Sequence, residues 1–159
     1  MREYTCCFSG HREISDNERR QIRPRLREAV ETLIARGVTD FITGGAYGFD
    51  AMAAQEVLYQ RKFHPIRLIL ALPCPDQTKN WPPSAVAEYE SIRAQADEEQ
   101  VLSIAYHKGC MLKRNDWMVA HSAYLICYRK TLSGGTAYTV KQAAKSGLRI
   151  RNLAKPENI

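Results

Sequence analysis

A glycine-rich turn between an apolar strand and a helix constrains the fold of this chain most strongly. The apolar run of residues 38–43 leads into Gly44-Gly45-Ala46-Tyr47-Gly48, and Asp50 then opens a segment with apolar residues at helical spacing. Glycine lets the chain turn tightly and lets a ligand approach the backbone. The first turn of a helix offers unpaired N–H groups that suit phosphate. A second turn, Thr131-Leu132-Ser133-Gly134-Gly135-Thr136, follows the apolar run 123–128. Two such turns favour a nucleotide-type ligand.

The rest of the chain alternates between strand-like and helix-like segments. We expect strands over 3–8, 38–43, 66–72, 101–106, 123–128 and 148–153, and helices over 16–36, 50–61, 85–98, 111–120 and 136–146. This order predicts an α/β, Rossmann-like, doubly wound and mainly parallel sheet with helices on both faces and the first strand at its centre. Asp16 or Asn17 is the expected cap of the first helix and Ser84 that of the third. Pro24 predicts a kink in the first helix or a late start of it.

Length and composition are typical of one soluble domain spanning residues 1–159. No apolar run reaches the roughly 18 residues of a membrane helix, and no secretory signal is visible, so a cytoplasmic protein is expected. The formal charge is +6, and arginines crowd the first helix. Such a cluster can contact nucleic acid, but we favour a solvated helix face with interleaved glutamates.

The five cysteines indicate neither a disulfide framework nor a zinc site, because their number is odd and no CxxC spacing occurs. Cys6, Cys7 and Cys127 fall in predicted strands, where cysteine usually behaves as a small buried apolar residue. Cys74 and Cys110 fall in predicted loops, where a thiol can be exposed. No other metal-ligand pattern is present in the sequence, so no metal is required.

The predicted ligand site lies beyond the carboxyl ends of the strands, where ligands bind in open α/β sheets. Glycine main-chain N–H groups would hold phosphates together with Thr136, Arg12 and Arg114 would add charge, and Asp50 and Asn115 would hold polar ligand groups. Tyr47 and Trp81 either stack on a base or cover the edge of the core. The predicted site residues are Gly10, His11, Arg12, Gly44, Gly45, Gly48, Asp50, Arg114, Asn115, Ser133, Gly134, Gly135 and Thr136. The competing interpretation is that the glycines only make turns, since the G-x-G-x-x-G spacing and the Walker lysine are both missing.

Four motifs together resemble the SLOG superfamily, specifically its compact YpsA-like branch, over nearly the whole chain. They are Phe8-Ser9-Gly10-His11-Arg12, Thr43-Gly44-Gly45-Ala46-x-Gly48-Phe49-Asp50, Arg114-Asn115-x-x-Met118-Val119 and Ser133-Gly134-Gly135-Thr136. The segment Lys79-Asn80-Trp81 is also similar to that branch. The resemblance implies a Rossmann-like fold that binds a nucleotide or a nucleotide-derived ligand such as AMP, NAD or ADP-ribose. It also implies self-association as a dimer or a larger homo-oligomer.

The same superfamily includes the LOG phosphoribohydrolases and the DNA-processing protein DprA, which define two alternative functions. LOG enzymes carry P-G-G-x-G-T-x-x-E, whose glutamate assists cleavage of the N-glycosidic bond; here Ser133 replaces the proline and Lys141 stands at the glutamate position. A lysine cannot supply that carboxylate, and no spacing supports Glu56 or Glu90 as a substitute, so no catalytic residue is predicted. Ligand binding or sensing is the leading hypothesis. A LOG-like nucleoside 5′-monophosphate phosphoribohydrolase with altered catalytic residues comes second, and a DprA-like single-stranded DNA binder third. The predicted glycine cradle leads us to expect that Gly45→Val abolishes ligand binding without unfolding the protein.

Overall fold

The computed structural model of the protein describes residues 2–155, whose six strands form one parallel sheet in the order β4-β3-β2-β1-β5-β6. The order reverses between β1 and β5, which places the switch point of a doubly wound sheet beside the first strand. The expected Rossmann-like fold with β1 at its centre is therefore confirmed. The strands are β1 (Thr5–Gly10), β2 (Asp40–Thr43), β3 (Arg67–Leu72), β4 (Glu98–Val101), β5 (Tyr124–Tyr128) and β6 (Arg149–Asn152).

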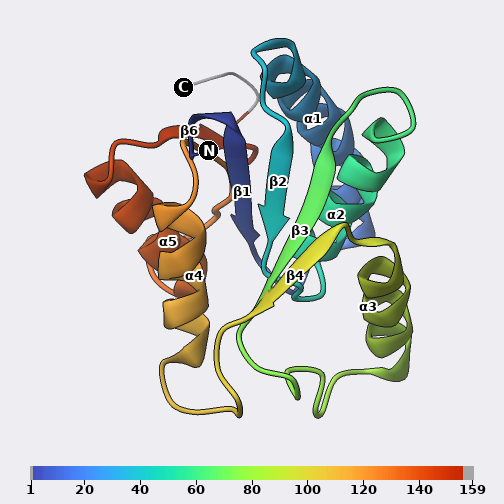
Figure 1. Ribbon diagram of the computed structural model, residues 1–159, viewed down its shortest axis with the longest axis vertical. Coiled ribbons are helices and arrows are strands. Elements are labelled where there is room, and N and C mark those ends of the chain that lie inside the picture. The colour runs from blue at the N-terminus through green and yellow to red at the C-terminus, as the bar shows by residue number, and fades with distance from the viewer. Residues whose placement is uncertain (1, 156–159) are drawn as a thin grey trace.

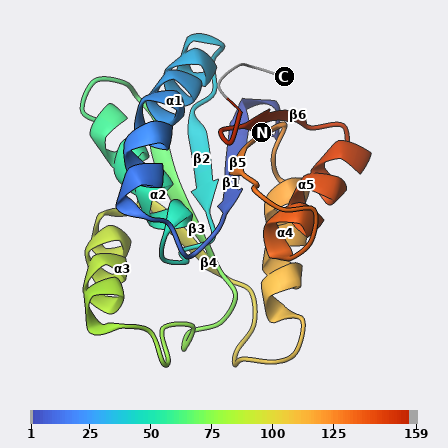
Figure 2. The same cartoon turned by 180° about the vertical axis from the view of Figure 1, so that it is seen from behind.

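Five α-helices cover the two faces of the sheet. In Figures 1 and 2, one face carries α1, α2 and α3, and the opposite face carries α4 and α5. A short 3-10 helix, Arg2–Tyr4, precedes β1. The α-helices are α1 (Asp16–Ala35), α2 (Phe49–Gln60), α3 (Pro83–Gln95), α4 (Cys110–Ala120) and α5 (Gly135–Lys145). No helix within residues 2–155 is long and apolar enough to cross a membrane.

Alternate residues of the central strands supply two separate cores. Phe8, Phe41 and Leu70 face the α1–α3 side, where they pack in the larger core with apolar residues of those helices. Cys7 and Ile42 face the other side and pack with residues of α4 and α5 such as Met118. Successive side chains of a strand point to opposite faces, so strands covered on both sides become apolar throughout. This explains the near-continuous apolar runs in the sequence.

Helix α1 begins earlier than its proline suggested. Ser15 is its N-cap: the Ser15 hydroxyl accepts from the backbone N–H of Glu18, and the Glu18 carboxylate accepts from the backbone N–H of Ser15. This reciprocal pair satisfies two N–H groups that the first turn leaves unpaired. Pro24 lies inside the helix, so a late start is wrong, and the cap is Ser15 instead of Asp16 or Asn17. Helix α3 starts after Pro82 instead of Ser84, because proline fits the first turn well.

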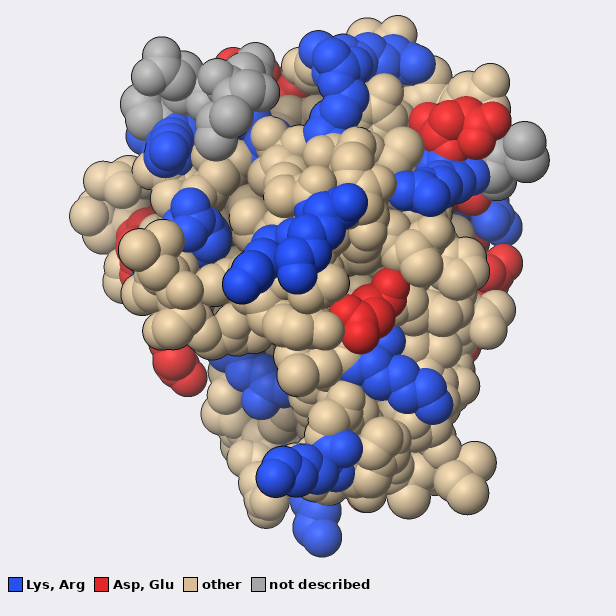
Figure 3. Space-filling model, turned by 90° about the vertical axis from the view of Figure 1, so that its left-hand side faces the viewer, with Lys and Arg blue, Asp and Glu red and all other residues tan. Residues whose placement is uncertain are grey.

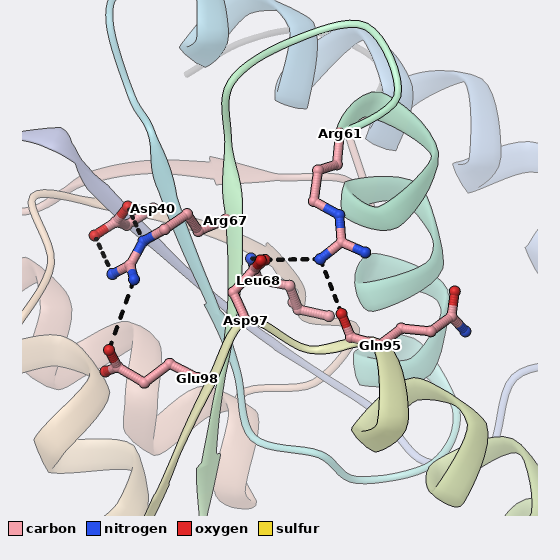
Figure 4. Close-up of polar contacts among 7 residues, drawn as sticks. All are labelled: Asp40, Arg61, Arg67, Leu68, Gln95, Asp97 and Glu98. Atoms are coloured by element: carbon pink, nitrogen blue, oxygen red, sulfur yellow. Dashed lines mark hydrogen bonds and ion pairs between the residues drawn. The ribbon is translucent and has the colours of Figure 1, made fainter.

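The fourth strand lies at Glu98–Val101, not at the predicted 101–106. It is an edge strand with exposed side chains, held to β3 by charged contacts at its start (Figure 4). The Asp97 carboxylate accepts from the backbone N–H of Leu68 at 2.8 Å and pairs with Arg61, while Glu98 pairs with Arg67. The apolar run beyond it is not a strand, and Ile104 is 98% exposed. The apolar pattern failed here because an edge strand pairs with a single neighbour and needs little burial.

All five cysteines are buried, including Cys74 and Cys110, for which exposure had been considered. Cys110 is the first residue of α4 instead of a loop residue. Burial raises the pKa of the Cys7 and Cys127 thiols to about 12 and that of Cys74 to about 11. A thiol with such a pKa is protonated at neutral pH, which disfavours nucleophilic chemistry at these positions.

Candidate functional site

An open cleft of about 1090 Å³ lies where the carboxyl ends of the strands meet, at the switch point between β1 and β5. Its wall combines residues from the end of β1, the starts of α2 and α4, the loop after β3 and the loop after β5. These segments are far apart in sequence, and the parallel sheet brings them to one edge. Ten of the thirteen predicted site residues line it: Gly10, His11, Arg12, Asp50, Arg114, Asn115, Ser133, Gly134, Gly135 and Thr136.

Arg114 is the most unusual charge in the cleft because its guanidinium is almost fully buried. It donates to the Asn115 side-chain oxygen at 2.8 Å and to the carbonyl oxygen of Gly44. These two acceptors are neutral, as is the Met111 sulfur, which accepts from Nη2 at 3.8 Å, and within residues 2–155 the guanidinium forms no ion pair. Burial lowers its pKa, although an arginine stays protonated at any physiological pH. The buried Asp50 carboxylate offsets part of this charge without forming an ion pair, and an anion in the cleft would stabilise the buried cation further.

Asp50 is the buried carboxylate of the cleft. Burial raises its pKa, while the positive charges of Arg114 and Arg12 and the backbone N–H of Ala46 oppose that rise. The Ala46 N–H donates to Asp50 at 3.3 Å. This side chain, in the first turn of α2, therefore contacts the backbone of the turn after β2, where the sequence predicts a ligand anion.

The three glycines of that turn lie outside the cleft wall, and packing explains them. A Cβ atom on Gly44 would collide with the Arg114 guanidinium, and one on Gly48 with the backbone carbonyl of Arg12. At Gly45 the backbone has a φ of +73°, and a Cβ atom would lie 2.8 Å from the Leu72 side chain. Left-handed backbone therefore favours glycine at positions 45 and 48 whether or not a ligand binds, and the Arg114 guanidinium occupies the space beside Gly44.

The second glycine turn is built differently. Gly134, at φ +97°, precedes α5, which has no side-chain cap. A Cβ atom on Gly135 would meet nothing within 4 Å, and the Gly135 backbone does not lie in the left-handed region. Nothing in the packing of residues 2–155 therefore requires glycine at position 135, although it lines the cleft. The first turn of α5 therefore has N–H groups without a side-chain cap, and Ser133 and Thr136 beside it line the cleft.

Aromatic side chains form the opposite side of the cleft. The Arg12 guanidinium lies 5.2 Å from the ring centroid of Tyr47 and 5.6 Å from that of Trp81, which are cation–π distances. The Trp81 ring also packs edge-on against Tyr47 at 5.0 Å and against Tyr89 at 5.5 Å. Trp81 covers the edge of the core, as one interpretation expects, and it also lines the cleft; stacking on a base stays a prediction.

His11 ties two loops of the site together. Its Nε2 atom accepts from the backbone N–H of Lys130 at 3.1 Å. Burial and the nearby Lys130 charge lower the pKa of the His11 imidazole, so its neutral form, which can accept this bond, is favoured. Sequence reasoning named no role for Lys130, nor for Glu13, Asp76 and Lys79, which also line the cleft. These four residues lie in the loops that follow β1, β3 and β5, and that position in the sequence could have identified them as residues of the cleft.

The alternative catalytic glutamates do not reach the cleft. Glu56 is buried on α2, where it pairs with Arg27 and accepts from the Gln60 amide at 2.9 Å. Glu90 is exposed on α3 and, like Lys141 on α5, does not line the cleft. Among residues 2–155 no cluster of three or more His, Cys, Asp or Glu side chains is arranged to hold a metal ion.

A doubly wound parallel sheet with this cleft at its switch point defines a Rossmann-like α/β protein. The family model YpsA, described as the YspA SLOG family, matches residues 7–152, so the chain belongs to that family. It is 28% identical over 144 residues to the SPbeta prophage-derived protein YoqJ of Bacillus subtilis, covering 80% of this chain and 83% of YoqJ. It is 26% identical over 128 residues to the UPF0398 protein BH1768 of Halalkalibacterium halodurans, covering 78% and 68% of the two chains.

Two solved structures of DNA processing protein A share the fold. That from Helicobacter pylori, described for its single-stranded DNA binding mode, superposes with a TM-score of 0.67 at 20% identity. That from Streptococcus pneumoniae gives 0.68 at 13% identity. The alignments cover 95% and 94% of this chain, but only 65% and 50% of the respective DprA chains. At these identities the likeness concerns the fold alone.

Proposed function

We propose that the protein binds or senses a nucleotide or nucleotide-derived ligand in the cleft between β1 and β5. The observation that carries this proposal is the buried Arg114 guanidinium, which lines the cleft without an ion pair among the described residues. An arginine so placed suits a phosphate group, which it can contact through two parallel N–H donors. Asn115 holds it in position through Nε.

The phosphate is proposed to lie at the start of α5. The N–H groups of its first turn have no side-chain cap. The space that a Cβ atom at position 135 would occupy is empty, because no other atom of the described residues lies within 4 Å of it. Backbone N–H groups and the positive end of the helix dipole both favour an anion there. Since a side chain at position 135 would extend into that space, the missing Cβ atom is best explained by close approach of a ligand.

The remainder of the ligand is proposed to contact Asp50, Tyr47 and Trp81. A buried carboxylate can accept hydrogen bonds from ribose hydroxyls or from an amino group. An aromatic ring at the cleft wall offers a surface on which a base can stack. The ligand class is therefore a phosphate-bearing nucleoside derivative, such as AMP, NAD or ADP-ribose.

A thermal-shift screen with AMP, NAD, ADP-ribose and cyclic dinucleotides tests this proposal. A ligand at 100 times its Kd adds about 2.7 kcal/mol to the stability of the folded state, which gives a clear shift for a chain of this length. The same shift should be absent in Arg114→Gln and retained in Arg20→Gln, which removes an equal charge from exposed surface on α1. A shift of equal size in both variants, or none with any compound, would contradict the proposal.

The samples of the thermal-shift screen also distinguish a nucleotide hydrolase from a protein that only binds its ligand. If a bound nucleotide is also consumed, chromatography will detect free base; if the protein only binds, the compound is recovered intact. The cleft contains the carboxylates of Glu13, Asp50 and Asp76, but Lys141, at the position of the LOG glutamate, lies outside it. We therefore expect recovery of the intact compound.

Binding of single-stranded nucleic acid is the second candidate. It is supported by the shared fold of Helicobacter pylori DprA, whose structure is described for that activity. The surface in Figure 3, which carries α4 and α5, also shows more Lys and Arg than Asp and Glu.

Self-association as a dimer or a larger homo-oligomer stays a prediction. Light scattering on the purified protein measures its oligomeric state.

A further inference from the structure

A second, strongly basic hollow lies beside the cleft, between α1 and the ends of β5 and β6. Its volume is about 410 Å³, and four cations line it: Arg25, Arg129, Lys130 and Lys155. Among the described residues no Asp or Glu lines it, whereas three carboxylates line the larger cleft. Such an imbalance of charge makes this hollow electropositive.

The hydrogen bonds of these cations leave most of their donors available. The Arg129 side chain has no hydrogen-bond or ion-pair partner among residues 2–155, and its Nε is shielded from solvent. Arg25 uses one N–H, which donates to the Leu153 carbonyl at 3.0 Å. Only Lys130 has a carboxylate partner, Glu18, at 2.9 Å. The Arg129 guanidinium lines the hollow, and its terminal N–H donors form no bond to residues 2–155.

The hollow and the cleft are neighbours, because Lys130 lines both. The loop after β5 therefore contributes Lys130 to both sites, Ser133 and Gly134 to the cleft, and Arg129 to the hollow. A ligand with a single phosphate needs only one of these positions. A ligand with consecutive phosphates can place one at α5 and pass the next across Lys130 into the hollow.

We propose that the basic hollow is a second phosphate subsite, which takes the next phosphate of a ligand whose nucleoside part lies in the cleft. This inference rests on the proposed function of the cleft and extends it to phosphodiester or phosphoanhydride chains. Arg129 supplies a guanidinium that has no protein partner among residues 2–155, and Arg25, Lys130 and Lys155 add charge around it. Arginine and lysine together suit a phosphate because one gives paired N–H donors and the other a mobile point charge.

The test uses fluorescein-labelled oligothymidylate of about eight nucleotides, within the usual site size of single-strand binders. Affinity is measured over a range of salt concentrations for the full chain and for Arg129→Gln, Lys155→Gln and both together. Each lost phosphate contact should reduce the slope of log affinity against log salt by about 0.7 for a single strand. Arg23→Gln is the matched control, since it removes an exposed charge of α1 that lies outside the hollow. Thermal melting of each variant verifies folding, and exposed Lys155 gives a substitution that does not depend on shielded packing.

Three outcomes decide the matter. Reduced slopes in the Arg129 and Lys155 variants, with unchanged AMP binding and an unchanged slope in Arg23→Gln, would support the subsite. Slopes equal to that of the unaltered chain, or no binding of oligothymidylate by it, would overturn the subsite while leaving AMP binding in the cleft intact. If AMP fails to bind but the oligothymidylate slopes still fall, the cleft proposal is the one that fails. Competition by tripolyphosphate shows whether free phosphate chains also occupy the hollow.

Discussion

The guanidinium of Arg114, at the start of α4, donates to the carbonyl oxygen of Gly44, which lies 70 residues earlier at the end of β2. This bond joins two segments of the sheet edge, and a Cβ atom at position 44 would displace the guanidinium that makes it. The same side chain lines the cleft, so it has a structural and a proposed ligand-binding role. The two roles predict separable effects.

Replacing Arg114 should lower both stability and ligand affinity. In Arg114→Gln the Gly44 carbonyl loses its charged donor, which should reduce the free energy of unfolding by about 1–3 kcal/mol. Arg114→Lys keeps the charge but loses the paired donors, so it should bind nucleotide at least about tenfold more weakly. Urea denaturation and isothermal titration measure the two quantities. Nucleotide affinity unchanged in Arg114→Lys would show that paired donors are not used.

The two glycine turns should respond in opposite ways to alanine. Gly135→Ala should leave stability unchanged or increase it by up to about 1 kcal/mol, because alanine favours a helix and meets open space. Its nucleotide affinity should fall. Gly45→Ala should lose about 1–3 kcal/mol of stability, since a left-handed backbone and contact with Leu72 both oppose a Cβ atom. Gly45→Val, whose side chain is larger still, should destabilise the fold more than Gly45→Ala, unlike the expectation from sequence that it leaves a folded protein. Equal affinity of Gly135→Ala and the unaltered chain would contradict ligand contact at position 135.

Tryptophan fluorescence should report the cleft. Only two tryptophans are present: Trp81 lines the cleft, whereas Trp117 packs in the α4–α5 core and stacks on His121. A base stacking on Trp81 should quench emission in Trp117→Phe and leave it unchanged in Trp81→Phe. Stacking of one base is worth about 1–3 kcal/mol, so Trp81→Ala should bind at least about fivefold more weakly. Quenching that persists in Trp81→Phe would place the base elsewhere.

Acid should weaken the fold through Glu18. The Tyr128 hydroxyl, the Ser15 backbone N–H and Lys130 together lower the pKa of this carboxyl from 4.5 to about 2. A depressed folded-state pKa contributes stability above pH 4.5, and this contribution is lost as the pH falls toward 2. Glu18→Gln should be less stable than the unaltered chain at pH 7, and the difference should shrink over that range. Urea denaturation at several pH values tests this, and a constant difference would exclude Glu18 as the cause.

Sequence reasoning predicted elements best where burial decides them. The strands at residues 40–43, 67–72 and 124–128 lie within their predicted ranges, because a strand covered on both faces needs an uninterrupted apolar run. It was wrong at β4, where Asp97, Glu98 and Glu99 form ion pairs at the sheet edge. Charge pairing across neighbouring segments leaves no periodic signal in the sequence.

For the candidate site too, local sequence determined some features and the tertiary structure decided others. The local order of residues determined that two glycine turns follow strands and open helices, since backbone geometry at a turn depends on few neighbours. Both turns contribute residues to the cleft wall, and only the tertiary structure decided that Gly134 and Gly135 line the cleft whereas Gly44, Gly45 and Gly48 do not. The turn after β2 is filled by Asp50 and by packing around its glycines, whereas the turn after β5 stays open at Gly135. The basic hollow of Arg25, Arg129, Lys130 and Lys155 likewise exists only after folding, because its members come from α1, the β5 end and the segment after β6. Contacts between residues so distant in sequence are set by the packing of the sheet and its helices, which no local pattern encodes.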